Sequence, residues 1–160
     1  ELLIGKTMDV TPTENAVKID AKHVLSQIII NLVAGNGFTE ASLAAAKISV
    51  KINRLKTQAT ANLSTGAVTA QGDDTNLIPL KEEGNSYMAL IIPQAVGDGN
   101  LITVNVDGRD FNLPKSSQFS AFEAGKKYKF TVTLSKTSNG VNVNISKWED
   151  DGIDYGGTAE

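Results

Sequence analysis

Polar and apolar residues alternate without interruption along residues 127–134, which read Lys-Tyr-Lys-Phe-Thr-Val-Thr-Leu. An extended chain sends successive side chains to opposite faces, so a period of two collects the apolar residues on one face. The inward row consists of Tyr128, Phe130, Val132 and Leu134. On a helix the same residues would point in every direction. The segment is therefore predicted to be a strand with one buried face.

The residues that follow repeat this pattern, with an inward row of Val141, Val143 and Ile145. Asn139-Gly140 separates the two runs, and this dipeptide accepts the positive φ angles that a two-residue hairpin turn requires. We therefore expect a β-hairpin within residues 125–150. Trp148 is out of phase with Ile145, which indicates a bulge or a strand end near Lys147.

Alternation predicts strands elsewhere in the chain as well. The clearest inward rows are Ile28, Ile30 and Leu32; Ile48, Val50 and Ile52; and Ile102, Val104 and Val106. Shorter strands are expected at residues 2–4, 17–19, 57–63, 67–70 and 111–113. Met88–Ile92 is a nearly continuous apolar run, so we expect a strand that ends at Pro93 and is either buried on both faces or lies across a sandwich interior.

One segment favours a helix. Thr39 is a good N-cap and the alanines up to Ala46 favour helix, so a short helix is predicted there. Many short strands separated by glycine-containing turns are typical of a β-sandwich. The chain has 160 residues, with no internal repeat and no long linker. We therefore expect one domain over residues 1–160.

The composition excludes several classes of protein. Hydrophobic residues make up 41% of the chain, which is too many for a disordered protein. Fifteen Lys and Arg against 18 Asp and Glu give a net charge of −3, which does not indicate binding to nucleic acid or to an anionic membrane. The absence of cysteine excludes disulfides and thiol catalysis. The longest apolar run, around residues 28–34, is too short to cross a bilayer.

No catalytic, cofactor-binding or metal-binding residue is predicted. His23 is the only histidine, and it is interpreted as a partly packed residue at the start of a strand, hydrogen bonded to the backbone. The acidic segment around Asp150 matches no complete calcium-ligand pattern and is interpreted as a solvated tail. Asp107 and Asp110 are interpreted as turn residues. Gly97-Asp98-Gly99 precedes a strand rather than a helix, so it is interpreted as a turn and not as a phosphate loop.

Three other features have unremarkable interpretations. Asn62-Leu63-Ser64 and Asn144-Ile145-Ser146 fit the glycosylation sequon, which matters only in a eukaryotic secretory chain. Four lysines near the predicted hairpin are interpreted as a soluble outer face rather than a basic binding face. These are Lys126, Lys127, Lys129 and Lys136. Trp148 is interpreted as a core residue.

Three segments, taken in order, resemble the fimbrillin family, which comprises type V pilins and related surface lipoproteins of Gram-negative anaerobes. Glu1-Leu2-Leu3-Ile4 is similar to the D-L-L opening of the C-terminal half of such proteins. His23-Val24-Leu25-Ser26 is similar to the family's H-x-L-S strand. The most specific match is the closing hairpin, G-x-x-Y-x-x-x-(V/L)-x-L followed by I-x-x-W. It corresponds to Phe122–Leu134, Val141–Ile145 and Trp148.

The resemblance implies an all-β fold, a transthyretin-like two-sheet Greek-key β-sandwich with one short helix. It covers only the C-terminal half of a typical member, so it implies an N-terminal domain and a lipid-bearing cysteine upstream. It also implies a cell-surface protein, an outer-membrane lipoprotein before processing, with a role in fimbriae for adhesion and biofilm contact. The implied partners are other fimbrial subunits, joined by strand addition at an open sheet edge, and host or bacterial surface ligands. No cofactor, nucleic acid or membrane span is implied.

Several roles stay open at this point. The residues after Trp148 are few, acidic and rich in glycine, which makes a poor donor strand, so shaft, tip and anchor roles all remain. The alternatives are a non-polymerising surface lipoprotein and a glycan-binding β-sandwich module. The second alternative needs exposed aromatic residues, and aromatic residues are only 6% of the chain. A hydrolase or metal enzyme is disfavoured because the chain has one histidine and no cysteine.

Overall fold

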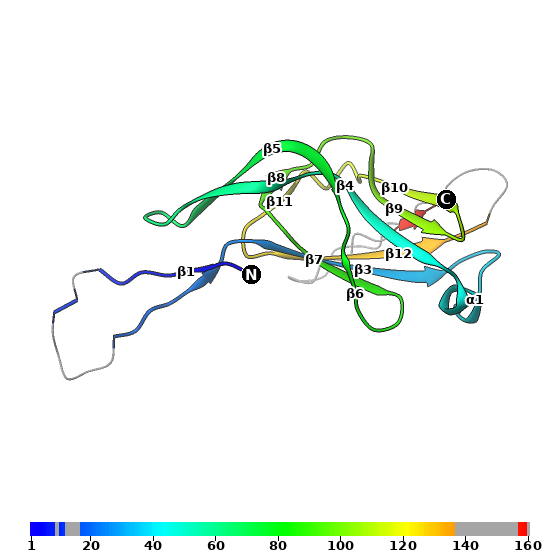
Figure 1. Cartoon of the computed structure of the whole chain (residues 1–160), viewed down its shortest axis with the longest axis horizontal. Helices are drawn as coiled ribbons and strands as arrows, with labels where there is room; N and C mark the ends of the chain where they lie inside the picture. The colour runs from blue at the N-terminus through cyan, green and yellow to red at the C-terminus, as the bar shows by residue number, and fades with distance from the viewer. Residues whose placement is uncertain (9, 12–16, 137–156, 160) are drawn as a thin grey trace.

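Two main β-sheets lie face to face, and one short helix sits at one end of them (Figure 1). The computed structural model describes residues 1–8, 10–11 and 17–136, together with the backbone of residues 157–159. The predicted all-β sandwich with one short helix is confirmed.

The first sheet is antiparallel throughout and has the strand order β10, β9, β4, β5. Its strands are β4 (Ile48–Asn62), β5 (Ala67–Leu77), β9 (Asn100–Val106) and β10 (Arg109–Pro114). β4 joins two segments that the sequence predicts separately. A bulge connects them between Ile52 and Leu55, where Arg54 has a φ of 56°. The extra residue resets the alternation, so Ile52 and Leu55 both face the core despite their odd spacing.

The second sheet has the strand order β13, β12, β3, β7, β6. Its strands are β3 (Ser26–Ala34), β6 (Leu80–Lys81), β7 (Ser86–Ile91), β12 (Lys127–Leu134) and β13 (Gly157–Ala159). β12 runs parallel to β3, with Tyr128 opposite Ile28. It is the first strand of the predicted hairpin. The second predicted strand, Val141–Ile145, and Trp148 lie outside the described residues.

Three small elements complete the fold. Two pairs of two-residue strands stand apart from the main sheets: β1 (Leu3–Ile4) with β2 (Lys22–His23), and β8 (Gln94–Ala95) with β11 (Ala121–Phe122). The helix α1 (Glu40–Ala45) follows Thr39, whose Oγ1 accepts a hydrogen bond from the Ser42 N–H at 3.1 Å. The predicted N-cap is therefore confirmed. Leu43 is buried and attaches the helix to the core.

The core forms where the predicted inward rows of the two sheets meet. The rows of residues 28–32, 102–106 and 128–134 are buried as expected, and Val50 and Ile52 join them from β4. Phe119 lies among Phe122, Tyr128 and Phe130, with ring centroids 5.0 to 5.7 Å apart in edge-to-face arrangements. This geometry favours aromatic packing beyond simple burial.

One strand prediction is wrong, and one of two alternatives for another strand is excluded. Val17 and Ile19 are exposed and belong to no strand, because the described residues provide no sheet for that segment to join. Of the two alternatives for Met88–Ile92, burial on both faces is excluded, and a strand across the sandwich interior agrees with the structure. β7 alternates instead, with Ala89 and Ile91 inward and Leu90 outward and 37% exposed. The second sheet packs against the first through one face only, so the opposite face of β7 stays accessible.

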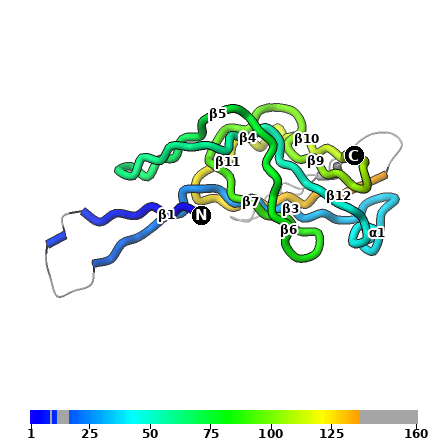
Figure 2. Tube along the Cα trace, viewed as in Figure 1, coloured from blue at the N-terminus to red at the C-terminus, as the bar shows by residue number. Residues whose placement is uncertain are grey.

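Two slender parts of the chain project from the same end of the sandwich, opposite α1 (Figures 1 and 2). The first is the ribbon, which is the part of the β4–β5 hairpin over residues 57–70. The second is the N-terminal arm, which comprises the described residues up to Ala21. The two meet where the Lys6 Nζ donates a hydrogen bond to the Ser64 carbonyl at 2.5 Å.

Candidate functional site

Exposed apolar side chains gather on two surfaces. All ten large apolar side chains that are exposed among the described residues belong to one or the other. The arm end, formed by the N-terminal arm and the ribbon tip, carries Leu2, Leu3, Met8, Val10, Val17, Ile19 and Leu63. The β7 edge carries Ile78, Leu80 and Leu90. Single exposed apolar residues are normal, but gathered ones indicate surfaces that another molecule or segment covers.

The β7 edge is an incomplete edge of the second sheet. β6 has only two residues, and its pairing with β7 stops at Leu80 opposite Met88. The Glu82 N–H donates to the Ser86 carbonyl at 2.9 Å, so the backbone N–H and C=O of Ser86 point toward β6. In a strand, every second residue points its backbone groups the same way, so Met88 and Leu90 also point toward the β6 side. Leu90 is one of these residues, and none of the described strands pairs with it there. Its N–H and C=O are thus oriented to receive a further strand.

The β7 edge also offers apolar contact. Ile78 is 74% exposed and lies two residues before Leu80, so it stands near the unpaired part of β7. A hollow of about 120 Å³ lies beside this edge. Its lining includes Leu55 and Leu77 from the first sheet and Leu90 and Ile91 from the second. An added strand would meet backbone groups along its length and apolar surface beside it.

The outer edges of β5 and β4 are protected against strand addition. β5 carries Gly72, Asp73 and Asp74, and glycine and charged residues discourage pairing. The outer edge of β4 is occupied at Lys56 by a side chain. The Gln94 Oε1 accepts from the Lys56 N–H at 2.8 Å, and the Gln94 Nε2 donates to the Lys56 carbonyl at 3.0 Å. This amide fills the two hydrogen-bonding positions that a neighbouring strand would use.

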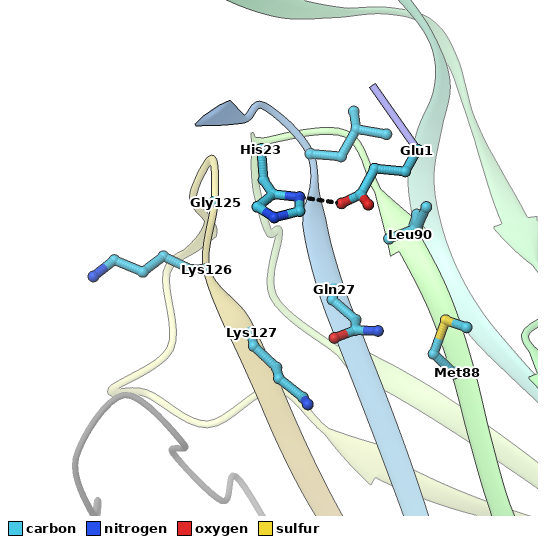
Figure 3. Close-up of a pocket in the computed structure, with 9 residues that line it drawn as sticks. Glu1, His23, Gln27, Met88, Leu90, Gly125, Lys126 and Lys127 are labelled. Atoms are coloured by element: carbon cyan, nitrogen blue, oxygen red, sulfur yellow. Dashed lines mark hydrogen bonds and ion pairs between the residues drawn. The ribbon is translucent and has the colours of Figure 1, made fainter. Parts of the chain in front are cut away.

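A larger hollow, of about 420 Å³, lies on the outer face of the second sheet (Figure 3). His23 and Glu1 point toward each other at its rim, and Nδ1 of His23 contacts Oε1 of Glu1. His23 is exposed and ends β2, because Leu3 pairs with it and brings Glu1 alongside. The interpretation as a partly packed residue at the start of a strand is therefore corrected. Among the described residues that line this hollow there is no serine, threonine or cysteine, so they offer no hydroxyl or thiol nucleophile beside the imidazole.

The turn interpretations agree with the structure. Asp107 has a φ of 51° between β9 and β10, and its Oδ1 accepts from the Lys47 N–H at 2.9 Å. Asp110 accepts from the Asn105 side chain across the same hairpin. Asp98 lies in the turn before β9 and forms an ion pair with Lys115 at 3.0 Å. Each carboxylate thus has a local structural contact.

The remaining sequence candidates form no recognisable chemical centre. In the part of the chain that the structure describes, no group of three His, Asp or Glu side chains could hold a metal ion. Lys127 and Lys129 lie on the exposed face of β12 as expected, and Lys136 lies 4.4 Å from the ring of Phe38. The acidic segment around Asp150 and the second sequon lie outside the described residues. None of the described helices is long and apolar enough to cross a bilayer.

Sequence reasoning missed the β7 edge because its residues look like ordinary core residues. Ile78-Pro79-Leu80 reads as a short apolar run, yet Pro79 is buried while its two neighbours are exposed. Proline has no N–H and restricts the residue before it, so it interrupts the passage from β5 to β6 and keeps β6 short. This proline is the signal that could have identified the incomplete edge.

Comparison with known proteins assigns the chain to a family. The family model described as fimbrillin-like matches residues 1–148. A candidate fimbrium subunit of Bacteroides uniformis, Fim1C, is 30% identical over 143 residues, which is 85% of this chain and 46% of that protein. The crystal structure of a candidate cell-adhesion protein from Bacteroides uniformis superposes with a TM-score of 0.63 at 28% identity. The match covers 75% of this chain and 49% of that one.

A second crystal structure, of a candidate cell-adhesion protein from Bacteroides ovatus, has the same fold. Its TM-score is 0.57 at 22% identity, and the match covers 73% of this chain and 42% of that one. The chain thus spans about half the length of the relatives it matches. Since the family model accounts for nearly all of the sequence, this chain belongs to the fimbrillin-like family.

Proposed function

We propose that this domain is a structural, adhesive component of cell-surface fimbriae, and that it accepts a strand from a neighbouring subunit at the β7 edge. Family membership and the similarity to a fimbrium subunit support the fimbrial role. The observation that carries the assembly mechanism is the short β6, because no described strand pairs with Leu90 on the β6 side of β7.

The incoming strand continues the line of β6 along β7. Its backbone pairs with the N–H and C=O of Leu90, and its alternate side chains divide between two surroundings. One set enters the hollow lined by Leu55, Leu77 and Ile91. The other set covers Leu90 and Ile78 on the outer side. Backbone pairing thus supplies affinity, and the hollow supplies selectivity for the inserted side chains.

The function requires no catalysis. The protein acts at the cell surface, where a lipid anchor on an upstream domain holds it to the outer membrane before processing. The described aromatic side chains support assembly over glycan binding. Six of them are buried, namely Tyr87, Phe111, Phe119, Phe122, Tyr128 and Phe130, and Phe38 is partly buried. No stacking platform for a sugar ring is therefore found on the described surface.

Paired substitutions in the native cell test the mechanism. Ile78→Asp and Leu90→Lys place a charge on the apolar edge, so we expect the ladder of stable oligomers on an unboiled detergent gel to fall at least about tenfold. Leu63→Asp is the matched control. Leu63 is 72% exposed, against 74% for Ile78, but it lies at the arm end. An unchanged ladder in both edge variants would overturn the assignment of this edge.

Immunogold electron microscopy of the same cells tests the fimbrial role. Label along filaments identifies a shaft subunit, and label at filament ends or bases identifies a tip or anchor. Diffuse surface label with a single monomer band would overturn the fimbrial proposal and favour a non-polymerising surface lipoprotein.

A further inference from the structure

We propose that the arm end is the docking surface for a second domain of the same polypeptide, namely the part by which the relatives exceed this chain. This inference does not depend on strand addition at the β7 edge, which involves a different set of residues. It is carried by three observations: bare apolar residues, a hollow between the arm and the ribbon, and the relative lengths of the proteins.

The first observation is an apolar face with nothing packed against it. Seven of the ten exposed large apolar residues belong to the arm end. Val17 and Ile19 show the period of two that marks a chain with one buried face. In the structure that face is bare, since both side chains are exposed. Apolar alternation of this kind implies that another surface covers the apolar face. No surface among the described residues does so.

The second observation is the geometry of the arm end. A hollow of about 440 Å³ separates the β1–β2 pair from the ribbon tip. Ile4, Val24 and Leu63 line it together with Lys6 and Asp20. Such a mixture of apolar and charged residues is typical of interfaces between domains of one chain, which are more polar than obligate subunit interfaces. The hydrogen bond from Lys6 to Ser64 ties the arm to the ribbon, so the two together form one surface.

The third observation selects the occupant. The chain covers 46% and 49% of two of its relatives, so each has about as many residues again. A second copy packed head to tail would have to present the α1 end to the arm end. None of the exposed large apolar residues in the described chain lies at the α1 end. That contact would place the apolar arm against a surface without large exposed apolar side chains, so it would bury little apolar area on the second copy. The additional length of the relatives therefore favours a second domain of the same polypeptide as the occupant.

Amide hydrogen exchange on two proteins tests the proposal. One is the 160-residue chain, and the other is the complete product of the gene that encodes it. We expect exchange in residues 2–8 and 62–66 to be at least about tenfold slower in the complete product, because docking restricts local opening of these segments. Equal exchange in the two proteins would overturn the proposal. Protection already present in the 160-residue chain and rising with its concentration would also overturn it, since a second copy would then be the occupant.

A double substitution provides the second arm of the test. Ile19→Asp with Leu63→Asp in the complete product should return exchange at the arm end to the rate of the 160-residue chain. Ile78→Asp is the control for exposure, and it should leave that exchange unchanged. In the 160-residue chain the double variant should keep the melting temperature within about 2 °C, because both side chains are exposed. Retained protection in the double variant would overturn the proposal whether or not strand addition at β7 holds.

Discussion

Tyr87 and Tyr128 are two buried tyrosines in opposite hydrogen-bonding situations. They are 3% and 5% exposed. The Tyr128 Oη accepts a hydrogen bond from the Glu123 N–H at 2.9 Å. The Tyr87 hydroxyl is buried with no hydrogen-bond partner in the structure. A buried hydroxyl without a partner loses its contact with water and gains nothing in return.

Replacing each tyrosine by phenylalanine should therefore have different effects. Tyr87→Phe removes an unpaired hydroxyl, so we expect the free energy of unfolding to stay constant or to rise by up to about 1 kcal/mol. Tyr128→Phe leaves the Glu123 N–H without its acceptor and should lower that free energy by about 1 kcal/mol. Urea denaturation of the two variants measures both changes. A loss of more than about 1 kcal/mol for Tyr87→Phe would show that its hydroxyl is paired.

The same two residues predict a sensitivity to alkaline pH. Burial raises the pKa of Tyr87 above its ordinary value, and burial is also the main cause of the raised pKa of Tyr128. A group whose pKa is raised in the folded state stabilises the fold fully below its unfolded pKa, which is about 10 for tyrosine. That stabilisation is lost as pH rises through the folded pKa. The free energy of unfolding should fall above about pH 10, and the fall should be smaller in Tyr87→Phe. An identical pH profile for this variant and the unmodified domain would contradict this expectation.

Among the elements, β4 shows how one side chain can take the place of a strand. β9 accompanies β4 only from Ile48 to Ile52, and the Arg54 bulge then turns the strand toward the ribbon. At Lys56 the Gln94 amide satisfies both backbone groups, where a strand would otherwise pair. Side-chain amides have one donor group and one acceptor group, which suits them to this position.

Gln94→Ala should lower the free energy of unfolding by about 1–2 kcal/mol, because two partly buried hydrogen bonds to the Lys56 backbone are lost. Gln71→Ala serves as the control. The Gln71 side chain is exposed on β5, next to the ribbon, and makes a single hydrogen bond with Thr60, so its loss should change stability by less than about 0.5 kcal/mol. Thermal unfolding followed by circular dichroism measures both. Equal effects of the two substitutions would show that the Gln94 bonds contribute little.

The elements also show what the sequence can predict. The alternation in residues 128–134 identifies the buried face of β12 correctly, because a strand's face depends only on local pattern. The strand with which β12 pairs does not depend on local pattern, so the parallel pairing of Tyr128 with Ile28 could not be predicted from the sequence. Leu101 is buried beside Ile102, although alternation places it on the outer face. The β7 edge was missed for a related reason, since an open edge is a property of neighbours.

The whole molecule is uneven along its longest axis. The arm and the ribbon project from one end, and α1 lies at the other end (Figure 1). Most of the exposed apolar residues lie at the projecting end, and the aromatic core lies in the sandwich. Regions with few buried contacts open at low free energy, whereas core strands open only with the whole domain.

Limited digestion with trypsin should reveal this difference. We expect the first cleavage in the 160-residue chain after Lys18, because residues 17–20 belong to no strand. Lys129 is also exposed, but its backbone pairs with Ile29 in the second sheet, so cleavage there should be slower. Mass spectrometry of early fragments distinguishes the two sites. An early fragment ending at Lys129 would contradict the expected order.

The two-residue pairing of β1 with β2 has a mechanical consequence. A pulling force applied through residue 1 acts first on this pair, whose strand register comprises only Leu3 with His23 and Ile4 with Lys22. A pair loaded at one end separates bond by bond, so it yields before the long strands of the sandwich carry tension. The sequence between Ile4 and Lys22 can then reach an extended length of up to about 60 Å at roughly 3.5 Å per residue. Under shear flow the arm would extend first and limit the force on the sandwich, which would stay folded.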